Sequence, residues 1–160
     1  MQILVMGVSG VGKTLIGEFL TERIGLRFLD ADAFHSAANI QKLTRGIPLT
    51  GADREPWLQA LHAALRAHEP TGAVLACSAL RERYRRTLLD GLTEPRIVFL
   101  AGDAALVSAR LQSRQGHFMC PALLASQFET LEPPTGGRVL ELDAALPPAE
   151  IVEAVDEWLA

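Results

Sequence analysis

Short apolar runs alternate along the chain with longer stretches in which apolar residues recur at helical spacing. The short runs, bounded by Gly, Pro or Asp, are residues 3–6, 27–29, 73–77, 97–100 and 139–142. The longer stretches are residues 14–24, 55–67, 80–89, 104–114 and 149–159. We predict that the runs are buried strands and the stretches helices. Alternation of this kind is typical of an α/β fold, in which helices cover both faces of a parallel sheet.

The longest interval without a predicted strand, residues 31–71, is expected to carry a second layer of helices. We place these helices at residues 33–44 and 53–68. The segment between them, residues 45–51, is rich in Gly and Pro and is predicted to be a loop. Pro56 fits the first turn of the following helix, where a missing N–H costs little.

Composition narrows the class of protein. The 160 residues are 49% hydrophobic and 21% charged, which suits one globular domain spanning residues 1–160. A net charge of -4 argues against a nucleic-acid-binding surface, and no stretch reaches membrane-spanning length. Two cysteines, Cys77 and Cys120, form no metal-ligand or disulfide pattern, and nothing in the N-terminal segment resembles a targeting signal. We therefore expect a cytoplasmic protein that binds neither nucleic acid nor membrane.

The strongest motif lies between the first predicted strand and the first predicted helix. It consists of Gly7, Val8, Ser9, Gly10, Val11, Gly12, Lys13 and Thr14, a full match to G-x-x-x-x-G-K-[ST]. Glycines let the backbone N–H groups turn inward, and the helix that follows adds its positive end, so the loop forms a nest for the phosphates of ATP. Lys13 is expected to bridge the β- and γ-phosphates and Thr14 to ligate Mg²⁺. A tight turn without a ligand is the bland alternative, and the strand-helix context argues against it.

Two carboxylates follow the second predicted strand. Asp30 and Asp32 are two residues apart and so share one side of an extended chain. At the carboxyl end of a strand they would face the phosphate loop, where one could hold Mg²⁺ and the other accept the proton of an acceptor hydroxyl. The third strand ends at Ser78 rather than at an Asp, so the metal needs a carboxylate from elsewhere. The alternative is that Asp32 caps the helix near Ala33 while Asp30 is a solvated turn residue.

Further polar residues could line an acceptor site. After Asp32 the chain carries His35, Asn39, Lys42, Arg45, Asp53, Arg54 and Trp57. These groups suit a polyhydroxylated anion, although a solvated helix face would have the same composition. The segment 77–81, with Tyr84 and Arg85 after it, follows the third strand and so falls near the same crevice.

A second candidate group lies farther along the chain. Arg110 and Arg114 share a helix face and lead into residues 115–119, a segment that we interpret as a mobile lid over about residues 113–122. Two ordinary surface arginines would have the same spacing. Gln127, Glu129 and Glu132 have no spacing that distinguishes them from exposed helix residues.

Taken together, these motifs resemble the bacterial-type gluconokinase family, relatives of shikimate kinase among the P-loop small-molecule kinases. The resemblance is carried by residues 4–14, 28–32, His35, Asn39, 46–50, Asp53, Arg54, 56–58, 77–80, Tyr84, Arg85, 116–119 and 126–132. It implies a three-layer sandwich with a five-stranded parallel sheet of order 2-3-1-4-5, a homodimer, and transfer of the γ-phosphoryl group of Mg·ATP to the 6-hydroxyl of D-gluconate.

The resemblance also implies roles for individual residues. Asp32 corresponds to the catalytic base and Asp30 to a partner of Mg²⁺. The acceptor site would comprise His35, Asn39, Arg54, Arg81 and His117, while Lys13, Arg110 and Arg114 would act on ATP. The chain departs from the family pattern at Ser36, Gly51 and Cys120, which bears on the acceptor loop and the lid rather than on the proposed catalytic groups.

Two other functions remain open from the sequence. One is a kinase for another small acceptor, such as shikimate, a nucleoside monophosphate or a related aldonic acid. The other is a nucleotide-binding regulatory module that never transfers phosphate, against which the presence of Asp32, Arg110 and Arg114 argues.

Overall fold

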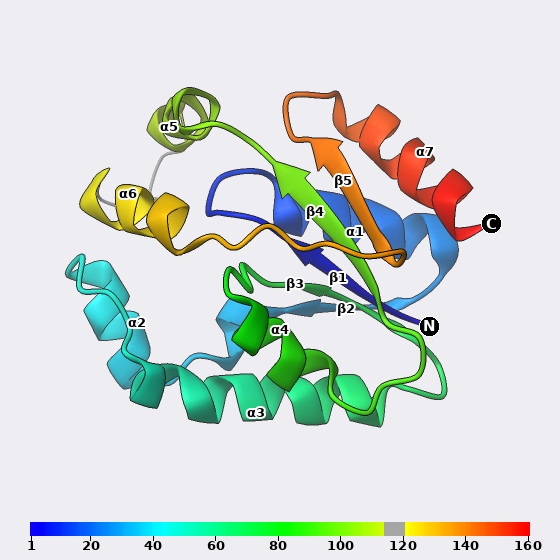
Figure 1. The fold of residues 1–160 in the computed structure, drawn as a ribbon, viewed down its shortest axis with the longest axis horizontal. Helices are drawn as coiled ribbons and strands as arrows, with labels where there is room; N and C mark the ends of the chain where they lie inside the picture. The colour runs from blue at the N-terminus through cyan, green and yellow to red at the C-terminus, as the bar shows by residue number, and fades with distance from the viewer. Residues whose placement is uncertain (114–120) are drawn as a thin grey trace.

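The computed structural model describes residues 1–113 and 121–160, which form a parallel sheet covered by helices on both faces (Figure 1). The strands are β1 (Gln2–Met6), β2 (Arg27–Asp30), β3 (Ala73–Ala76), β4 (Arg96–Ala101) and β5 (Val139–Asp143). Their order is β2-β3-β1-β4-β5 and neighbouring strands pair in parallel. The expected order 2-3-1-4-5 is therefore confirmed, and each predicted strand is present within a residue or two of its expected bounds.

The central strand β1 is buried on both faces, which explains its continuous apolar run. Leu4 and Met6 belong to one hydrophobic core, and Ile3 and Val5 to the other. Because successive side chains of a strand point to opposite faces, one apolar strand supplies both cores. Gln2, the polar member of the strand, is also buried, and its Nε2 donates a hydrogen bond to the carbonyl of Leu65 at 3.1 Å.

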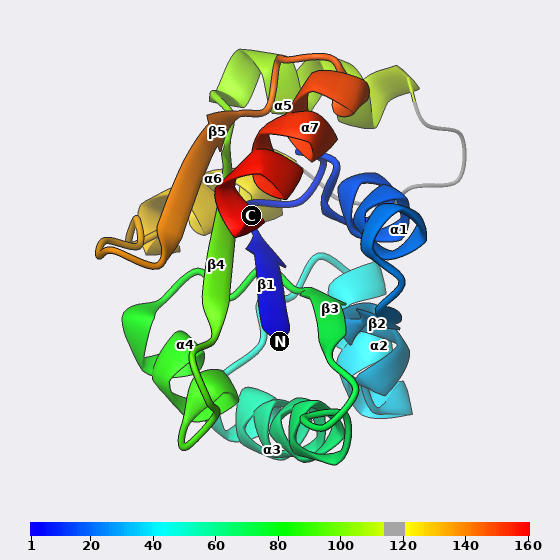
Figure 2. The same ribbon diagram turned by 90° about the vertical axis from the view of Figure 1, so that its right-hand side faces the viewer.

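Helices form the outer layers of the sandwich (Figure 2). The helices α1 (Lys13–Ile24), α5 (Ala104–Ser113) and α7 (Pro148–Leu159) cover one face, and α3 (Gly51–Ala67) and α4 (Glu82–Leu89) cover the other. This arrangement confirms the three-layer α/β sandwich. Within the described ranges, no helix combines the length and the apolarity needed to cross a membrane.

Two further helices, α2 (Ala37–Thr44) and α6 (Pro121–Thr130), lie beyond the carboxyl ends of the strands, on the left in Figure 1. The phosphate loop also opens at this end, because it follows β1 directly. The fold thus gathers the phosphate loop, α2 and α6 at one edge of the sheet, as expected for a ligand site in a doubly wound sheet.

The expected helix over residues 33–44 was wrong in its first turn. The chain instead forms a 3-10 turn over Ala31–Phe34, passes through His35 in an extended conformation, and starts α2 at Ala37. Ser36 explains the break, because its Oγ accepts a hydrogen bond from the backbone N–H of Asn39 and so caps α2. Ser36 is one of the residues at which the chain departs from the family pattern.

Candidate active site

The phosphate loop takes the backbone conformation that its glycines allow. Gly7 and Gly12 have φ values of 147° and 104°, in a region that residues with a side chain rarely adopt. A Cβ on Gly7 would come within 2.7 Å of the carbonyl oxygen of Leu100, so the loop is packed against the end of β4. Gly12 caps α1, and a Cβ added there would meet no atom within 4 Å, so its positive φ rather than crowding favours glycine at this position.

The functional side chains of the motif lie at the start of α1. Lys13 curls back over the loop, and its Nζ donates a hydrogen bond to the carbonyl oxygen of Val8 at 3.0 Å. Thr14 is exposed in the same turn of the helix. Binding of a triphosphate requires positive charge and hydrogen-bond donors at one place. The ammonium group of Lys13, the backbone N–H groups of the loop and the positive end of α1 supply them here.

The two carboxylates after β2 have different environments. Asp30 Oδ1 accepts a hydrogen bond from the backbone N–H of Asp32 at 2.9 Å and so caps the 3-10 turn. The alternative from the sequence had assigned the cap to Asp32, and this was wrong. The Asp32 side chain is exposed and lines a cavity at this end of the sheet, so it is available to a ligand.

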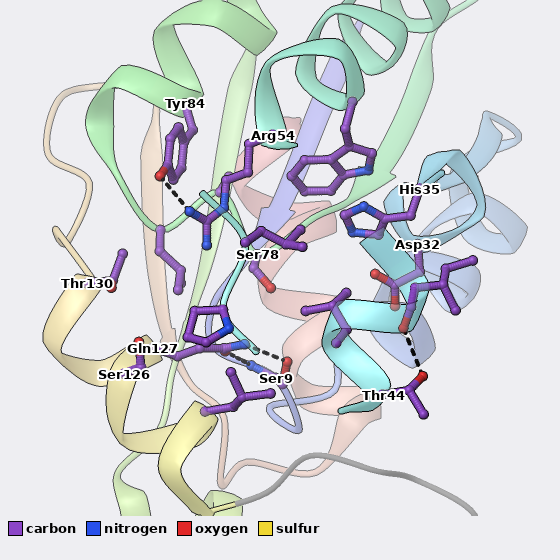
Figure 3. A pocket seen from close by; sticks show the side chains of 18 residues that line it. Ser9, Asp32, His35, Thr44, Arg54, Ser78, Tyr84, Ser126, Gln127 and Thr130 are labelled. Carbon is purple, nitrogen blue, oxygen red and sulfur yellow. Dashed lines mark hydrogen bonds between the residues drawn. The ribbon is translucent and has the colours of Figure 1, made fainter. Parts of the chain in front are cut away.

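That cavity, of about 370 Å³, is formed between α2, α6 and the carboxyl ends of the strands (Figure 3). Its polar lining comes from several segments of the chain: Ser9, Asp32, His35, Thr44, Arg54, Ser78, Tyr84, Ser126, Gln127 and Thr130. Ile40, Leu43, Pro48, Leu49, Trp57, Ala79, Leu80 and Leu123 complete it. Ser9 belongs to the phosphate loop, so the cavity reaches from the nucleotide site to the acceptor residues predicted from the sequence.

A stacked pair of rings forms one wall of the cavity. His35 lies on Trp57, with ring centroids 4.3 Å apart and planes 11° from parallel. The indole Nε1 of Trp57 donates a hydrogen bond to the carbonyl oxygen of Ala31 at 2.8 Å, which fixes the stack against the 3-10 turn. Burial, together with the positive charge of Arg54, lowers the pKa of His35 despite the opposing charge of Asp32. His35 is therefore neutral at pH 7 and can both donate and accept hydrogen bonds.

Arg54 enters the cavity from α3 and is held by Tyr84 (Figure 3). Its Nη1 donates a hydrogen bond to the Tyr84 hydroxyl at 3.1 Å, and Arg83 donates to the same hydroxyl at 3.3 Å. Both guanidinium groups also lie over the tyrosine ring, 5.2 Å and 5.1 Å from its centroid. Burial raises the pKa of the phenol, but the Arg83 hydrogen bond and the nearby positive charges outweigh it, and the pKa of Tyr84 is lowered. The cavity thus contains an oriented cation suited to a carboxylate.

Two residues assigned to the acceptor site do not line this cavity. Asn39 is buried, and its Nδ2 contacts His35 Nδ1 at 3.4 Å and donates to the carbonyl oxygen of Asp53 at 3.0 Å. It therefore supports His35 from behind rather than facing a ligand. Arg81 pairs with Glu132 at 3.5 Å and lines a neighbouring cavity. In this structure neither is positioned to contact an acceptor in the main cavity.

Arg110 contacts two backbone carbonyl groups, one of them in the phosphate loop. Its guanidinium donates hydrogen bonds to the carbonyl oxygens of Val11 at 3.0 Å and Ala144 at 2.6 Å. It braces the outer side of the phosphate loop against the turn after β5. Arg114 and His117, and most of the lid expected at about residues 113–122, lie outside the described residues.

The sequence missed the role of two side chains near the site. Gln127 on α6 bonds to Ser9 in the phosphate loop. Glu132 accepts a hydrogen bond from the backbone N–H of Glu82 at 2.9 Å and so caps α4 from a distant segment. A signal for Gln127 exists in retrospect, because Leu123, Ser126, Gln127 and Thr130 have the spacing of one helix face.

Two other chemistries find no support here. Burial raises the pKa of the Cys77 thiol to about 12, so this cysteine is no nucleophile at neutral pH. Among the residues that the structure describes, no group of three or more His, Cys, Asp or Glu side chains could hold a metal ion.

Several known kinases are similar to this chain in sequence and in structure. A family model for shikimate kinase matches residues 9–129. The chain is 46% identical to the thermosensitive gluconokinase of Escherichia coli strain K12, over 82% of this chain and 71% of that protein. The crystal structure of an unliganded sugar kinase from Janibacter sp. HTCC2649 is 40% identical, with a TM-score of 0.92 over 99% of this chain and 93% of that chain.

A second crystal structure, of a gluconokinase from Sinorhizobium meliloti 1021, is 44% identical, with a TM-score of 0.85 over 95% of this chain and 87% of that chain. Identity at this level over most of both chains goes well beyond a shared fold. The chain therefore belongs to the gluconokinase family of P-loop kinases, within the wider group that includes shikimate kinase.

Proposed function

We propose that the protein is an ATP-dependent carbohydrate kinase that transfers the γ-phosphoryl group of ATP to the 6-hydroxyl of D-gluconate, giving 6-phospho-D-gluconate and ADP. The observation that carries this proposal is the single cavity lined by both Ser9 of the phosphate loop and Asp32. Donor and acceptor groups can meet there. The names of the relatives, which are gluconokinases, supply the identity of the acceptor.

The donor is bound by the phosphate loop. Backbone N–H groups of the loop and the first turn of α1 surround the phosphates, and Lys13 exchanges its hydrogen bond to Val8 for the β- and γ-phosphates. Arg110 contributes indirectly, because its bonds to Val11 and Ala144 hold the loop in shape. This replaces the direct contact with ATP that the sequence suggested for Arg110.

The acceptor is bound by groups that match a sugar acid. Arg54, held by Tyr84, pairs with the carboxylate of gluconate, since a guanidinium binds a carboxylate through two parallel hydrogen bonds. Neutral His35 and the hydroxyls of Ser78 and Thr130 are available to the chain of secondary alcohols.

The reaction needs a base and an in-line phosphoryl group. As the 6-oxygen attacks the γ-phosphorus, its proton passes to the carboxylate of Asp32, the bond from the γ-phosphorus to the bridging oxygen breaks, and ADP leaves. The Trp57–His35 stack and the apolar side chains on α2 and α6 restrict water in the cavity, which favours the sugar hydroxyl over hydrolysis.

We further propose Mg²⁺ as the cofactor, with Thr14 and Asp30 as its protein ligands. Hard oxygen donors of this kind suit Mg²⁺, and the exposed Thr14 hydroxyl lies in the helix turn that follows Lys13. When bound, the ion would neutralise phosphate charge. Asp30 Oδ1 also accepts the hydrogen bond from the backbone N–H of Asp32, so the same residue holds Asp32 in position.

The remaining proposals rest on the resemblance. Arg114 and His117 act on ATP and the acceptor from the lid, the chain forms a homodimer, and the protein resides in the cytoplasm. The paired arginine Arg81 and the buried Asn39 support the site rather than contact the acceptor.

A panel of acceptors tests the proposed function. Purified protein with Mg·ATP should release ADP rapidly with D-gluconate and far more slowly with other aldonic acids, neutral sugars, shikimate and nucleoside monophosphates. Shikimate is included because the matching family model bears its name. Faster release with shikimate would reassign the acceptor, and no release with any compound would favour a non-catalytic nucleotide-binding module.

A further inference from the structure

The phosphate loop is tied to helix α6 by one side chain. Gln127 Oε1 accepts a hydrogen bond from the backbone N–H of Ser9 at 2.7 Å, and Gln127 Nε2 donates one to Ser9 Oγ at 3.1 Å (Figure 3). The two residues are 118 positions apart in the chain. Both are partly buried and both line the main cavity.

The contact needs an amide. The Ser9 backbone N–H can only donate, so it requires the oxygen of the Gln127 side chain, and the Ser9 hydroxyl then takes the nitrogen. A carboxamide meets both demands without adding charge. Neutrality matters at this point, because a negative side chain beside the phosphate loop would oppose the charge of ATP.

Ser9 occupies a particular place in the site. Of the residues in the phosphate loop, it is the one that lines the acceptor cavity. The same face of α6 that carries Gln127 also supplies Leu123, Ser126 and Thr130 to the cavity wall. The Gln127 contact therefore sets the distance between the wall that holds the acceptor and the loop that holds the donor.

We propose that Gln127 is a positioning residue for phosphoryl transfer, which acts through Ser9 to align the γ-phosphoryl group with the acceptor hydroxyl. The inference rests on the proposed function and adds a residue to it. Because alignment affects the transition state more than binding, loss of the contact should lower kcat while KM for each substrate stays nearly constant.

The test compares four proteins: wild type, Gln127→Met, Ser9→Ala and the double variant. Methionine fills the space of glutamine without its hydrogen bonds. We expect Gln127→Met to lower kcat about tenfold or more, with KM for ATP and acceptor within about threefold of wild type. Ser9→Ala removes one of the two hydrogen bonds and should give a smaller loss. The double variant should be no slower than Gln127→Met, because both changes break one contact.

The control is Gln59→Met on α3, an exposed glutamine whose Nε2 donates a hydrogen bond to the side chain of Glu55 at 2.9 Å. It should leave kcat, both KM values and the melting temperature unchanged. Unchanged kcat in Gln127→Met would overturn the proposal. Raised KM values in Gln127→Met with an unchanged kcat would also overturn it. So would a double variant whose loss of kcat equals the product of the losses in Gln127→Met and Ser9→Ala.

All rates are measured with whichever acceptor of the panel wild type phosphorylates fastest. If wild type phosphorylates none, the proposed function fails. If wild type is active and Gln127→Met is equally active, only the inference about Gln127 fails.

Discussion

Asp30 and Asp32 are two residues apart in the chain, yet the fold places their side chains in different environments. The carboxylate of Asp30 turns back to the backbone N–H of Asp32, and the carboxylate of Asp32 faces the cavity. A shared position at a strand end therefore does not imply a shared function. Asp30 holds the backbone of the 3-10 turn, and Asp32 is presented to the acceptor.

Replacing Asp32 by Asn tests its role as the base. A carboxamide keeps the shape of the side chain but cannot accept the proton, so kcat should fall by a factor of about 10² to 10⁴. Binding of ATP, measured by titration calorimetry, should be unchanged. Asp90→Asn, at the exposed end of α4, is the matched control and should have wild-type rates. Near-normal turnover in Asp32→Asn would assign the base elsewhere.

Tyr84→Phe isolates the hydroxyl that orients Arg54. The phenylalanine ring keeps the contact with both guanidinium groups and removes the acceptor of their hydrogen bonds. We expect KM for gluconate to rise about tenfold, because a hydrogen bond to a charged group is lost, with KM for ATP unchanged. Arg83→Met removes the second guanidinium that bonds to the Tyr84 hydroxyl and should raise KM for gluconate less. Equal effects would mean that Tyr84 does not act through Arg54.

Among single residues, the sequence predicted the location of those that lie close to a motif, whereas their roles stay predictions. Asp32, His35 and Arg54 all line the cavity, as their positions after β2 and at the start of α3 suggested. Asn39 and Arg110 do not line this cavity and instead bond to backbone carbonyl groups of other segments, which composition cannot reveal. Gln127 escaped notice for the same reason.

At the scale of elements, strands were easier to predict than the start of a helix. A buried strand needs only a short apolar run, and β1, β3 and β4 each have one. The start of α2 depends on the Ser36 cap, which overrides helical periodicity in the preceding turn. Helix α6 was not predicted as an element.

The start of α3 is stabilised by a capping box that also binds α2. Thr50 Oγ1 accepts from the backbone N–H of Asp53, and Asp53 Oδ2 accepts from the backbone N–H of Thr50 and from Lys42 Nζ. The Lys42 ammonium and then the Thr50 backbone hydrogen bond lower the pKa of Asp53 to about 2, from an ordinary value of 3.8.

This lowered pKa predicts a dependence of stability on pH. As the pH falls, the unfolded chain protonates Asp53 first, so its contribution is full above about pH 4 and is lost as the pH falls towards 2. Asp53→Asn should therefore melt at a lower temperature than wild type at pH 6, and the difference should shrink between about pH 4 and 2. Thermal melts across this range check it. A difference that does not change with pH would show that the charge of Asp53 is unimportant.

For the whole molecule, the alternation of strands and helices predicted the α/β class, whereas the strand order was an expectation from the family resemblance. Order matters, because it puts β1 in the middle of the sheet, with β3 and β4 at its sides. The phosphate loop after β1 therefore opens between the segments that follow β2, β3 and β4. No local pattern in the chain contains this information, since it depends on contacts between segments far apart.

The central claim is that one cavity brings the γ-phosphoryl group of ATP to the 6-hydroxyl of D-gluconate. Phosphorus NMR of a reaction with Mg·ATP and D-gluconate tests it most directly. We predict one new phosphomonoester signal, split into a triplet by the two protons on carbon 6, growing in a one-to-one ratio with ADP. A doublet from a secondary alcohol, or inorganic phosphate alone, would contradict the account.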